Sequence, residues 1–79
     1  MEELITYVAR ALVDNPDEVK VATTAAEGEG SQDLYELTVD QGDLGRIIGR
    51  RGRTARALRA VVRAAAAKTG RSAQLEIVE

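Results

Sequence analysis

The stretch of this chain that decides its fold reads Ile47-Ile48-Gly49-Arg50-Arg51-Gly52-Arg53-Thr54. Two glycines enclose two arginines, an apolar pair precedes them, and a long helical pattern follows. Glycine suits backbone that bends sharply or lies close to another chain, because it has no Cβ to clash. A loop that opens a helix offers unpaired N–H groups and the positive end of the helix dipole to an anion. With two guanidinium groups that match phosphate oxygens, the pattern predicts a clamp for a nucleic-acid backbone.

A simpler interpretation of the same residues is a tight turn between two helices, with arginines that serve solubility alone. The surroundings favour the clamp. Leu44, Ile47 and Ile48 predict an apolar helix end before the loop, and residues 54–68 predict a helix directly after it.

Composition narrows the possible functions. The 79 residues predict a single domain, 1–79, and they include no cysteine and no histidine. The usual general base, the commonest metal ligand and thiol chemistry are therefore missing, and the phosphate-loop pattern ending in Gly-Lys-Ser/Thr is absent. We expect no enzyme, metal, cofactor or small-molecule substrate. No apolar run is long enough to span a membrane and no signal-peptide pattern is present, which predicts a soluble cytoplasmic protein.

Charge is divided along the chain. The net charge is −2, yet residues 1–43 hold eleven acids and two bases, whereas residues 44–75 hold nine bases and no acid. This division predicts a basic face of the kind that binds nucleic acid, although a basic partner could equally dock on the acidic half.

Periodicity predicts the order helix-strand-strand-helix-helix-strand. The expected elements are a helix over 2–14, strands over 18–24 and 34–39, helices over 44–48 and from 53 or 54 to Gly70, and a strand over 73–77. The two first strands should form a hairpin, joined by a polar, mobile loop over 25–32. Asp40 or Asp43 is placed to cap the short helix, and Tyr7 should lie at the edge of the core.

The long helix has three faces at 100° per residue. The expected core stripe is Ala55, Leu58, Val61, Val62 and Ala65, and a second face carries Arg56, Arg59 and Arg63. A third face, which we call the alanine ridge, consists of Ala57, Ala60, Ala64 and Ala67, bordered by Val61. Small side chains there would let a second helix approach closely, which predicts a dimer interface. Alanine is also the best helix former, so an exposed face without a partner fits the same residues.

Residues 43–55, Asp-Leu-Gly-Arg-Ile-Ile-Gly-Arg-Arg-Gly-Arg-Thr-Ala, resemble the signature of KH domains. The order of elements is similar to the bacterial type II KH fold, and residues 12–17 resemble the N-terminal stretch of small stand-alone bacterial KH proteins. The resemblance covers nearly the whole chain. It implies an α+β fold in which a mixed three-stranded sheet is backed by three helices.

The resemblance also implies a function and a site. It implies a cytoplasmic protein that binds single-stranded RNA, acts as an RNA chaperone, pairs with a larger Jag-type KH protein, and serves cell-wall homeostasis and cell-length control. The implied RNA-binding residues are Arg46, Ile47, Ile48, Gly49, Arg50, Arg51, Gly52, Arg53, Thr54 and Val39. Residues 49–52 would hold the backbone, with a groove floor at residues 47–48 beside the strand ending at Val39. Leu37 could join that floor, although its alternation equally assigns it to the core.

One alternative class of function stays open at this point. A protein-interaction module could keep the KH shape and use the basic helix for an acidic partner. Salt-sensitive binding to unstructured oligonucleotides separates it from an RNA-binding protein.

Overall fold

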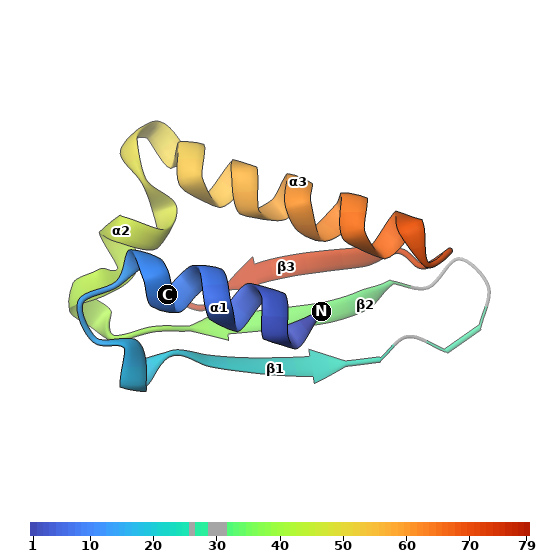
Figure 1. Cartoon of the computed structure of the whole chain (residues 1–79), viewed down its shortest axis with the longest axis horizontal. Coiled ribbons are helices and arrows are strands. Elements are labelled where there is room, and N and C mark those ends of the chain that lie inside the picture. The colour runs from blue at the N-terminus through green and yellow to red at the C-terminus, as the bar shows by residue number, and fades with distance from the viewer. Residues whose placement is uncertain (26, 29–31) are drawn as a thin grey trace.

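In the computed structural model, which describes residues 1–25, 27–28 and 32–79, three α-helices lie on one face of a three-stranded sheet (Figure 1). The elements are α1 (Glu2–Leu12), β1 (Lys20–Thr24), β2 (Asp33–Thr38), α2 (Leu44–Ile48), α3 (Arg53–Lys68) and β3 (Ala73–Ile77). Short 3₁₀ turns precede β1, α2 and α3, namely η1 (Pro16–Glu18), η2 (Gln41–Asp43) and η3 (Arg50–Gly52). The predicted α+β class and order of elements are confirmed.

The sheet is mixed, in the strand order β1-β2-β3. β1 runs antiparallel to β2, with Val21 opposite Leu37, so the predicted hairpin is confirmed. β3 runs parallel to β2, with Leu37 opposite Ile77. A parallel neighbour needs a crossover, and α2 and α3 supply it. The predicted loop over 25–32 falls partly on residues 26 and 29–31, which lie outside the described residues.

Two element boundaries differ from the prediction because of Pro16. α1 ends at Leu12 rather than residue 14, and Val13 is already extended (φ −104°, ψ 161°). A proline disfavours helical geometry in the residue before it but suits the first position of a turn. Residues 16–18 accordingly form η1, and β1 starts only at Lys20.

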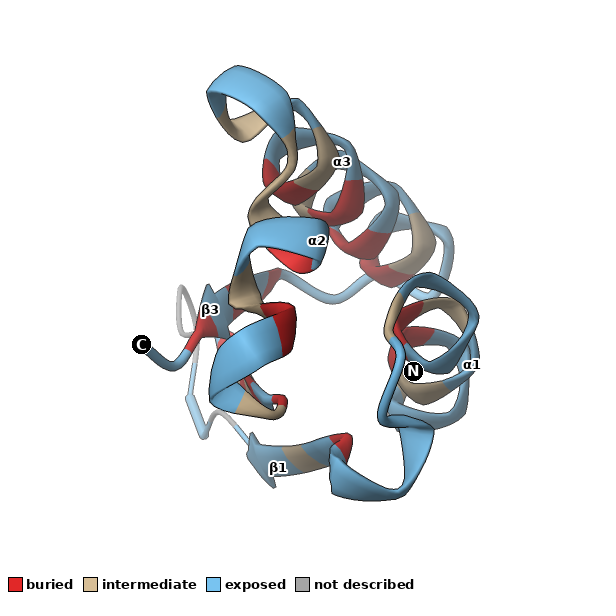
Figure 2. Ribbon diagram, turned by 90° about the vertical axis from the view of Figure 1, so that its left-hand side faces the viewer, coloured by how far each residue is buried: buried red, intermediate tan, exposed pale blue. Residues whose placement is uncertain are grey.

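The core lies between the sheet and the three helices, where the buried segments of α1, α2 and α3 face inward (Figure 2). Its members are Ile5, Ala9, Val19, Tyr35, Leu37, Val39, Ile47, Ala55, Leu58, Val62, Ala66, Ala73, Leu75 and Ile77. The alternation predicted for β2 and β3 is therefore confirmed, with every second residue of each strand buried.

Three side chains predicted at the core are placed differently. Tyr7 was expected at the core edge and is 76% exposed, because it lies on the outer face of α1. Val61 was expected in the core stripe of α3 and is 47% exposed, whereas Ala66 is buried. The buried line of α3 runs through Ala55, Leu58, Val62 and Ala66, so Ala65 lies at its edge and is half-buried.

Candidate nucleic-acid interface

The turn between α2 and α3, residues 49–52, is here called the glycine loop. α2 ends when the Gly49 N–H donates to the Gly45 carbonyl at 2.9 Å, and the Gly52 N–H then donates to the Gly49 carbonyl at 3.1 Å. Gly49 (φ 76°, ψ 171°), Arg51 (φ 58°, ψ 25°) and Gly52 (φ 73°, ψ 14°) all have positive φ. Such values favour glycine, and for an arginine they are strained. The loop thus reverses the chain within four residues.

Gly49 is required by close packing as well as by its backbone angles. A Cβ built at this position lies 2.7 Å from the Thr54 Cβ and 2.9 Å from the Thr54 backbone nitrogen. At Gly52 the nearest atom to a built Cβ is a side-chain nitrogen of Arg56, 3.9 Å away. The first glycine therefore lets the loop fold back against the start of α3, and half-buried Thr54 supports it there.

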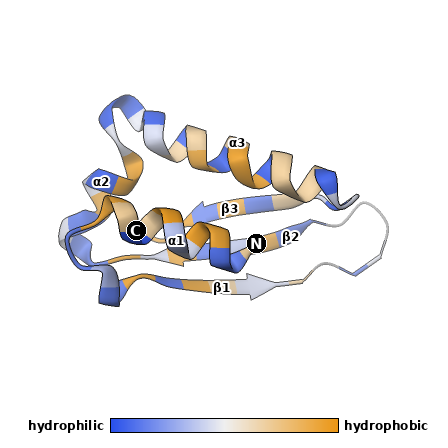
Figure 3. Ribbon diagram, viewed as in Figure 1, coloured by the Kyte–Doolittle hydropathy of each residue, from blue (hydrophilic) through white to orange (hydrophobic). Residues whose placement is uncertain are grey.

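The loop presents positive charge to solvent. Arg50, Arg51 and Arg53 are exposed, and among the described residues the ion pairs involve Arg46 and Arg71 instead. Figure 3 shows the hydrophilic loop directly after the apolar end of α2. The 16-residue helix α3 begins here, so the positive end of its dipole adds to the attraction for an anion.

A hollow of about 260 Å³ lies beside the glycine loop, and we call it the first hollow. It is lined by Ile48, Gly52, Ala55, Arg56, Arg59, Ile77 and Glu79. Ile48 and Ile77 give it apolar surface, while Arg56 and Arg59 give it two guanidinium groups. The side facing α3 is formed by the end of β3, so this hollow combines apolar area with two guanidinium groups and the carboxylate of Glu79.

Val39, predicted beside the groove floor, does not line the first hollow. Val39, Ile47 and Leu37 belong to the core, and none of the three lines this hollow. The strand that borders the hollow is β3, because β2 is the central strand and is covered by the helices. Of the predicted pair of isoleucines, only Ile48 lines the hollow.

Sequence reasoning missed Arg56, Arg59, Ile77 and Glu79 as residues of this site. The arginines carried a usable signal, since their helical spacing puts them on one face that starts at the loop. Ile77 and Glu79 carried none, because the strand that borders the loop depends on the order of strands in the sheet.

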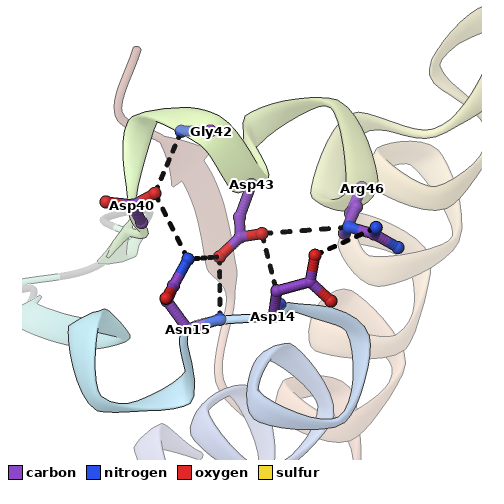
Figure 4. Close-up of polar contacts among 6 residues, drawn as sticks. All are labelled: Asp14, Asn15, Asp40, Gly42, Asp43 and Arg46. Atoms are coloured by element: carbon purple, nitrogen blue, oxygen red, sulfur yellow. Dashed lines mark hydrogen bonds and ion pairs between the residues drawn. The ribbon is translucent and has the colours of Figure 1, made fainter.

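Arg46, one of the predicted RNA-binding residues, belongs to a polar cluster with Asp14, Asn15 and Asp43 (Figure 4). Its Nη2 lies 3.0 Å from Asp14 Oδ2, and its Nε lies 3.8 Å from Asp43 Oδ1. Asp43, which is 2% exposed, accepts hydrogen bonds from the backbone N–H of Asp14 at 3.2 Å and of Asn15 at 3.0 Å. The Asn15 side-chain amide donates to the same carboxylate at 3.2 Å. The cluster thus ties the end of α1 to the start of α2.

The two aspartates predicted as alternative caps have separate roles. Asp40 caps η2, because its Oδ2 accepts from the Gly42 N–H at 3.2 Å. Asp43 binds residues 14–15 instead. Burial alone would raise the pKa of the Asp43 carboxyl, but the hydrogen bonds from Asp14 and Asn15 and the nearby Arg46 together hold this pKa below its ordinary value of 3.8. Asp43 is therefore a charged structural anchor of α2.

The alanine ridge faces solvent. All four of its alanines are exposed, and Val61 adds a larger apolar side chain beside them.

Within the described part of the chain, none of the helices is long and apolar enough to cross a membrane. The described residues also include no group of three or more acidic side chains arranged to hold a metal ion.

A mixed three-stranded sheet covered by three helices, with a Gly-x-x-Gly turn between the second and third helix, defines a type II KH domain. The family model described as "KhpA/KhpB, KH domain" matches residues 2–77. The chain belongs to this KhpA/KhpB family of KH domains.

Curated relatives agree with this assignment. The "RNA-binding protein KhpA" of Borreliella burgdorferi is 54% identical over 77 residues, which cover 98% of this chain and 90% of the relative. The protein of the same name from Halalkalibacterium halodurans is 45% identical over 80 residues, covering both chains fully. That of Aquifex aeolicus is 43% identical over 79 residues, covering all of this chain and 96% of the relative. No solved structure matches the chain.

Proposed function

We propose that this protein binds single-stranded RNA, with the glycine loop on the sugar-phosphate backbone and the first hollow holding bases. The observation that carries the proposal is the geometry of the loop. Its strained turn presents Arg50 and Arg51 without ion-pair partners among the described residues, directly beside apolar surface of Ile48 and Ile77. The names of the relatives, which are RNA-binding proteins, support the same ligand.

Each part of the site has a physical task in this proposal. Arg50, Arg51 and Arg53 attract the phosphates, and the start of α3 adds backbone N–H groups. The hollow accepts bases only where they are unpaired, because a KH domain clamps about four splayed nucleotides rather than a duplex. The chain has two aromatic residues, of which Tyr7 is on the outer face of α1 and Tyr35 is in the core, so stacking on aromatic rings is not part of the proposal.

The buried members of the predicted site act indirectly. Ile47 and Val39 hold α2 and the end of β2 in the core, and Thr54 packs against Gly49. Arg46 fixes α2 through its pairs with Asp14 and Asp43. These residues support the loop from behind, while the exposed residues of the loop make the contacts.

Charge reversal at the loop tests the proposal. The double variant Arg50→Asp and Arg51→Asp puts repulsion where attraction to phosphate is proposed, so RNA affinity should be lost while the unfolding temperature changes little. Both side chains are exposed, and surface substitutions cost about 0.5 kcal/mol or less. The matched control is Arg10→Asp with Lys20→Asp, which makes the same change in net charge at exposed positions of α1 and β1.

Fluorescence anisotropy with a labelled oligo(U) is the measurement. Unchanged RNA affinity in the loop variant, or an equal loss of affinity in the control, would contradict the proposed clamp. The protein-interaction alternative, in which the basic helix binds an acidic partner, would then become the better explanation.

We extend the proposal to association through the alanine ridge. A second copy, or a larger Jag-type KH protein, would pack a helix against Ala60 and Ala64, and two linked sites would gain affinity for one RNA through effective concentration. Ala64→Glu should then give a folded monomer with weaker RNA binding, measured by sedimentation at micromolar concentration. A wild-type monomer under those conditions would defeat this part.

The roles implied by the family resemblance complete the proposal. They are an RNA chaperone activity in the cytoplasm and a contribution to cell-wall homeostasis and cell length. Acceleration of strand annealing by the wild-type protein, but not by the loop variant, tests the chaperone role. Normal length in cells that carry only the loop variant would contradict the cellular role.

A further inference from the structure

A second hollow continues the first along the seam between α3 and β3. It measures about 240 Å³ and is lined by Gln32, Arg59, Arg63, Ala73, Gln74 and Leu75. Arg59 lines both hollows, and its Nε lies 3.4 Å from the Leu75 carbonyl oxygen, so its side chain reaches across the seam where the two meet. The two hollows therefore form one path that leads away from the glycine loop.

The second hollow differs in chemistry from the first. Arg63 supplies a guanidinium group without an ion-pair partner among the described residues, and it is exposed. Gln32 and Gln74 supply carboxamides, which can both donate to and accept from the edges of bases. The apolar residues of this lining, Ala73 and Leu75, are both buried, and no half-buried apolar side chain such as Ile48 lines the second hollow. The second hollow thus suits a phosphate and a base edge rather than the face of a base.

The second hollow extends the path along both α3 and β3. Arg56 and Arg63 are seven residues apart on α3, which corresponds to about 10 Å along the helix axis. Ile77 and Ala73 are four residues apart on β3, which corresponds to about 13 Å. A loop of this kind holds about four nucleotides.

From this arrangement we propose that the second hollow is an additional RNA subsite, with Arg63 on a phosphate and Gln74 on a base edge. It takes nucleotides beyond those held at the glycine loop, so the protein reads a longer single-stranded tract of about six to seven nucleotides. The inference rests on the proposed function, because it extends the same RNA path.

The test compares oligo(U) of four and eight nucleotides on three proteins: wild type, Arg63→Glu and Lys68→Glu. Lys68 is the matched control, because it is an exposed base of α3 that lines neither hollow. Binding of the four-nucleotide oligomer is followed by NMR shifts, and that of the eight-nucleotide one by anisotropy. Longer oligomers offer more binding registers, so each variant is compared with Lys68→Glu on the same oligomer.

We expect Arg63→Glu to weaken eight-nucleotide binding about fivefold or more while four-nucleotide binding stays within about twofold, and to flatten the salt slope of the longer oligomer by about 0.7. Lys68→Glu should keep both affinities close to those of wild type. Gln74→Glu, which puts an acid in the hollow from β3, should repeat the effect of Arg63→Glu independently of α3.

Equal losses for both oligomers, or no loss for the longer one, would overturn the additional subsite. Failure of the subsite can be distinguished from failure of the proposed function. If Arg50→Asp with Arg51→Asp abolishes four-nucleotide binding while Arg63→Glu leaves the length dependence unchanged, only the subsite is wrong. If the loop variant binds like wild type, the proposed function fails and the subsite with it.

Discussion

Replacing Gly49 by alanine should destabilise the fold far more than replacing Gly52, although both glycines belong to the same loop. Gly49 has φ 76° and ψ 171°, a region that is essentially restricted to glycine and costs another residue about 1–3 kcal/mol. The new Cβ would also lie 2.7 Å from the Thr54 Cβ, whereas ordinary contacts between carbons are about 3.5–4.0 Å. The start of α3 must therefore move by about 1 Å, and such overpacking costs about 1–3 kcal/mol more.

These two contributions amount to about 2–6 kcal/mol. A chain of 79 residues has a free energy of unfolding of about 4–12 kcal/mol, so Gly49→Ala removes a large share of it. Gly52→Ala is the matched control. Its φ of 73° carries a left-handed penalty of about 1–2 kcal/mol, but the nearest atom to the new Cβ is 3.9 Å away and belongs to a flexible side chain.

Urea unfolding followed by far-UV circular dichroism measures both variants. With a slope of about 1 kcal/mol per molar urea, each 1 kcal/mol lowers the midpoint by about 1 M. We expect Gly52→Ala to shift the midpoint by about 1–2 M and Gly49→Ala to shift it further, or to leave the protein unfolded without denaturant. Equal shifts for the two variants would refute the close packing of Gly49 against Thr54.

Other predictions concern the strained arginine, the buried carboxylate and the proposed ligand. Arg51→Gly should raise the free energy of unfolding by about 0.5–1 kcal/mol. Glycine relieves the strain of a left-handed φ of 58°, and this gain exceeds the cost of a more flexible unfolded chain. A lower urea midpoint would contradict this prediction. Asp43→Asn should lower the stability of the fold at pH 7. The pKa of Asp43 is lower in the folded protein than in the unfolded chain, so its charged form stabilises the fold above pH 3.8 and this contribution is lost as the carboxyl is protonated. The difference in stability between wild type and variant should therefore narrow as the pH falls below 3.8. Thermal melts at pH 7 and pH 2.5 measure that difference, and a difference of equal size at both would exclude the charged anchor. If three or four arginines contact phosphates, log K should fall with log salt at a slope of about −2 to −3, and a slope near zero in anisotropy titrations would mean that the basic face is only solvated.

Features set by local sequence were predicted well. The bounds of α2 followed from an apolar pair closed by Gly49, and the alternation of β2 and β3 identified their buried residues. A turn at Gly49 was predicted as well. The positive φ of Arg51 was not, because arginine carries no local preference for that conformation.

Features set by tertiary packing could not be read from the chain. Periodicity placed Val61 and Val62 on one broad stripe, and only the position of α3 over the sheet decides which of the two is buried. Arg46 was assigned to the site from its place in the motif, and its ion pair with Asp14, two residues after the end of α1, could not be predicted. The strand that borders the first hollow depends on the order of the sheet, so the sequence could not show that Ile77 rather than Val39 lines it.

The division of charge also affects how the protein meets the proposed ligand. Seven of the eleven basic residues belong to the glycine loop and α3, and β1 lies on the opposite side of the molecule (Figure 1). A net charge of −2 means that a distant polyanion is weakly repelled, and attraction begins only when the basic side comes within about 8 Å, the screening length at physiological salt. Association therefore lacks the long-range acceleration that proteins of high positive charge obtain. Contacts with unsuitable nucleic acid should be brief, and the protein should exchange rapidly between transcripts.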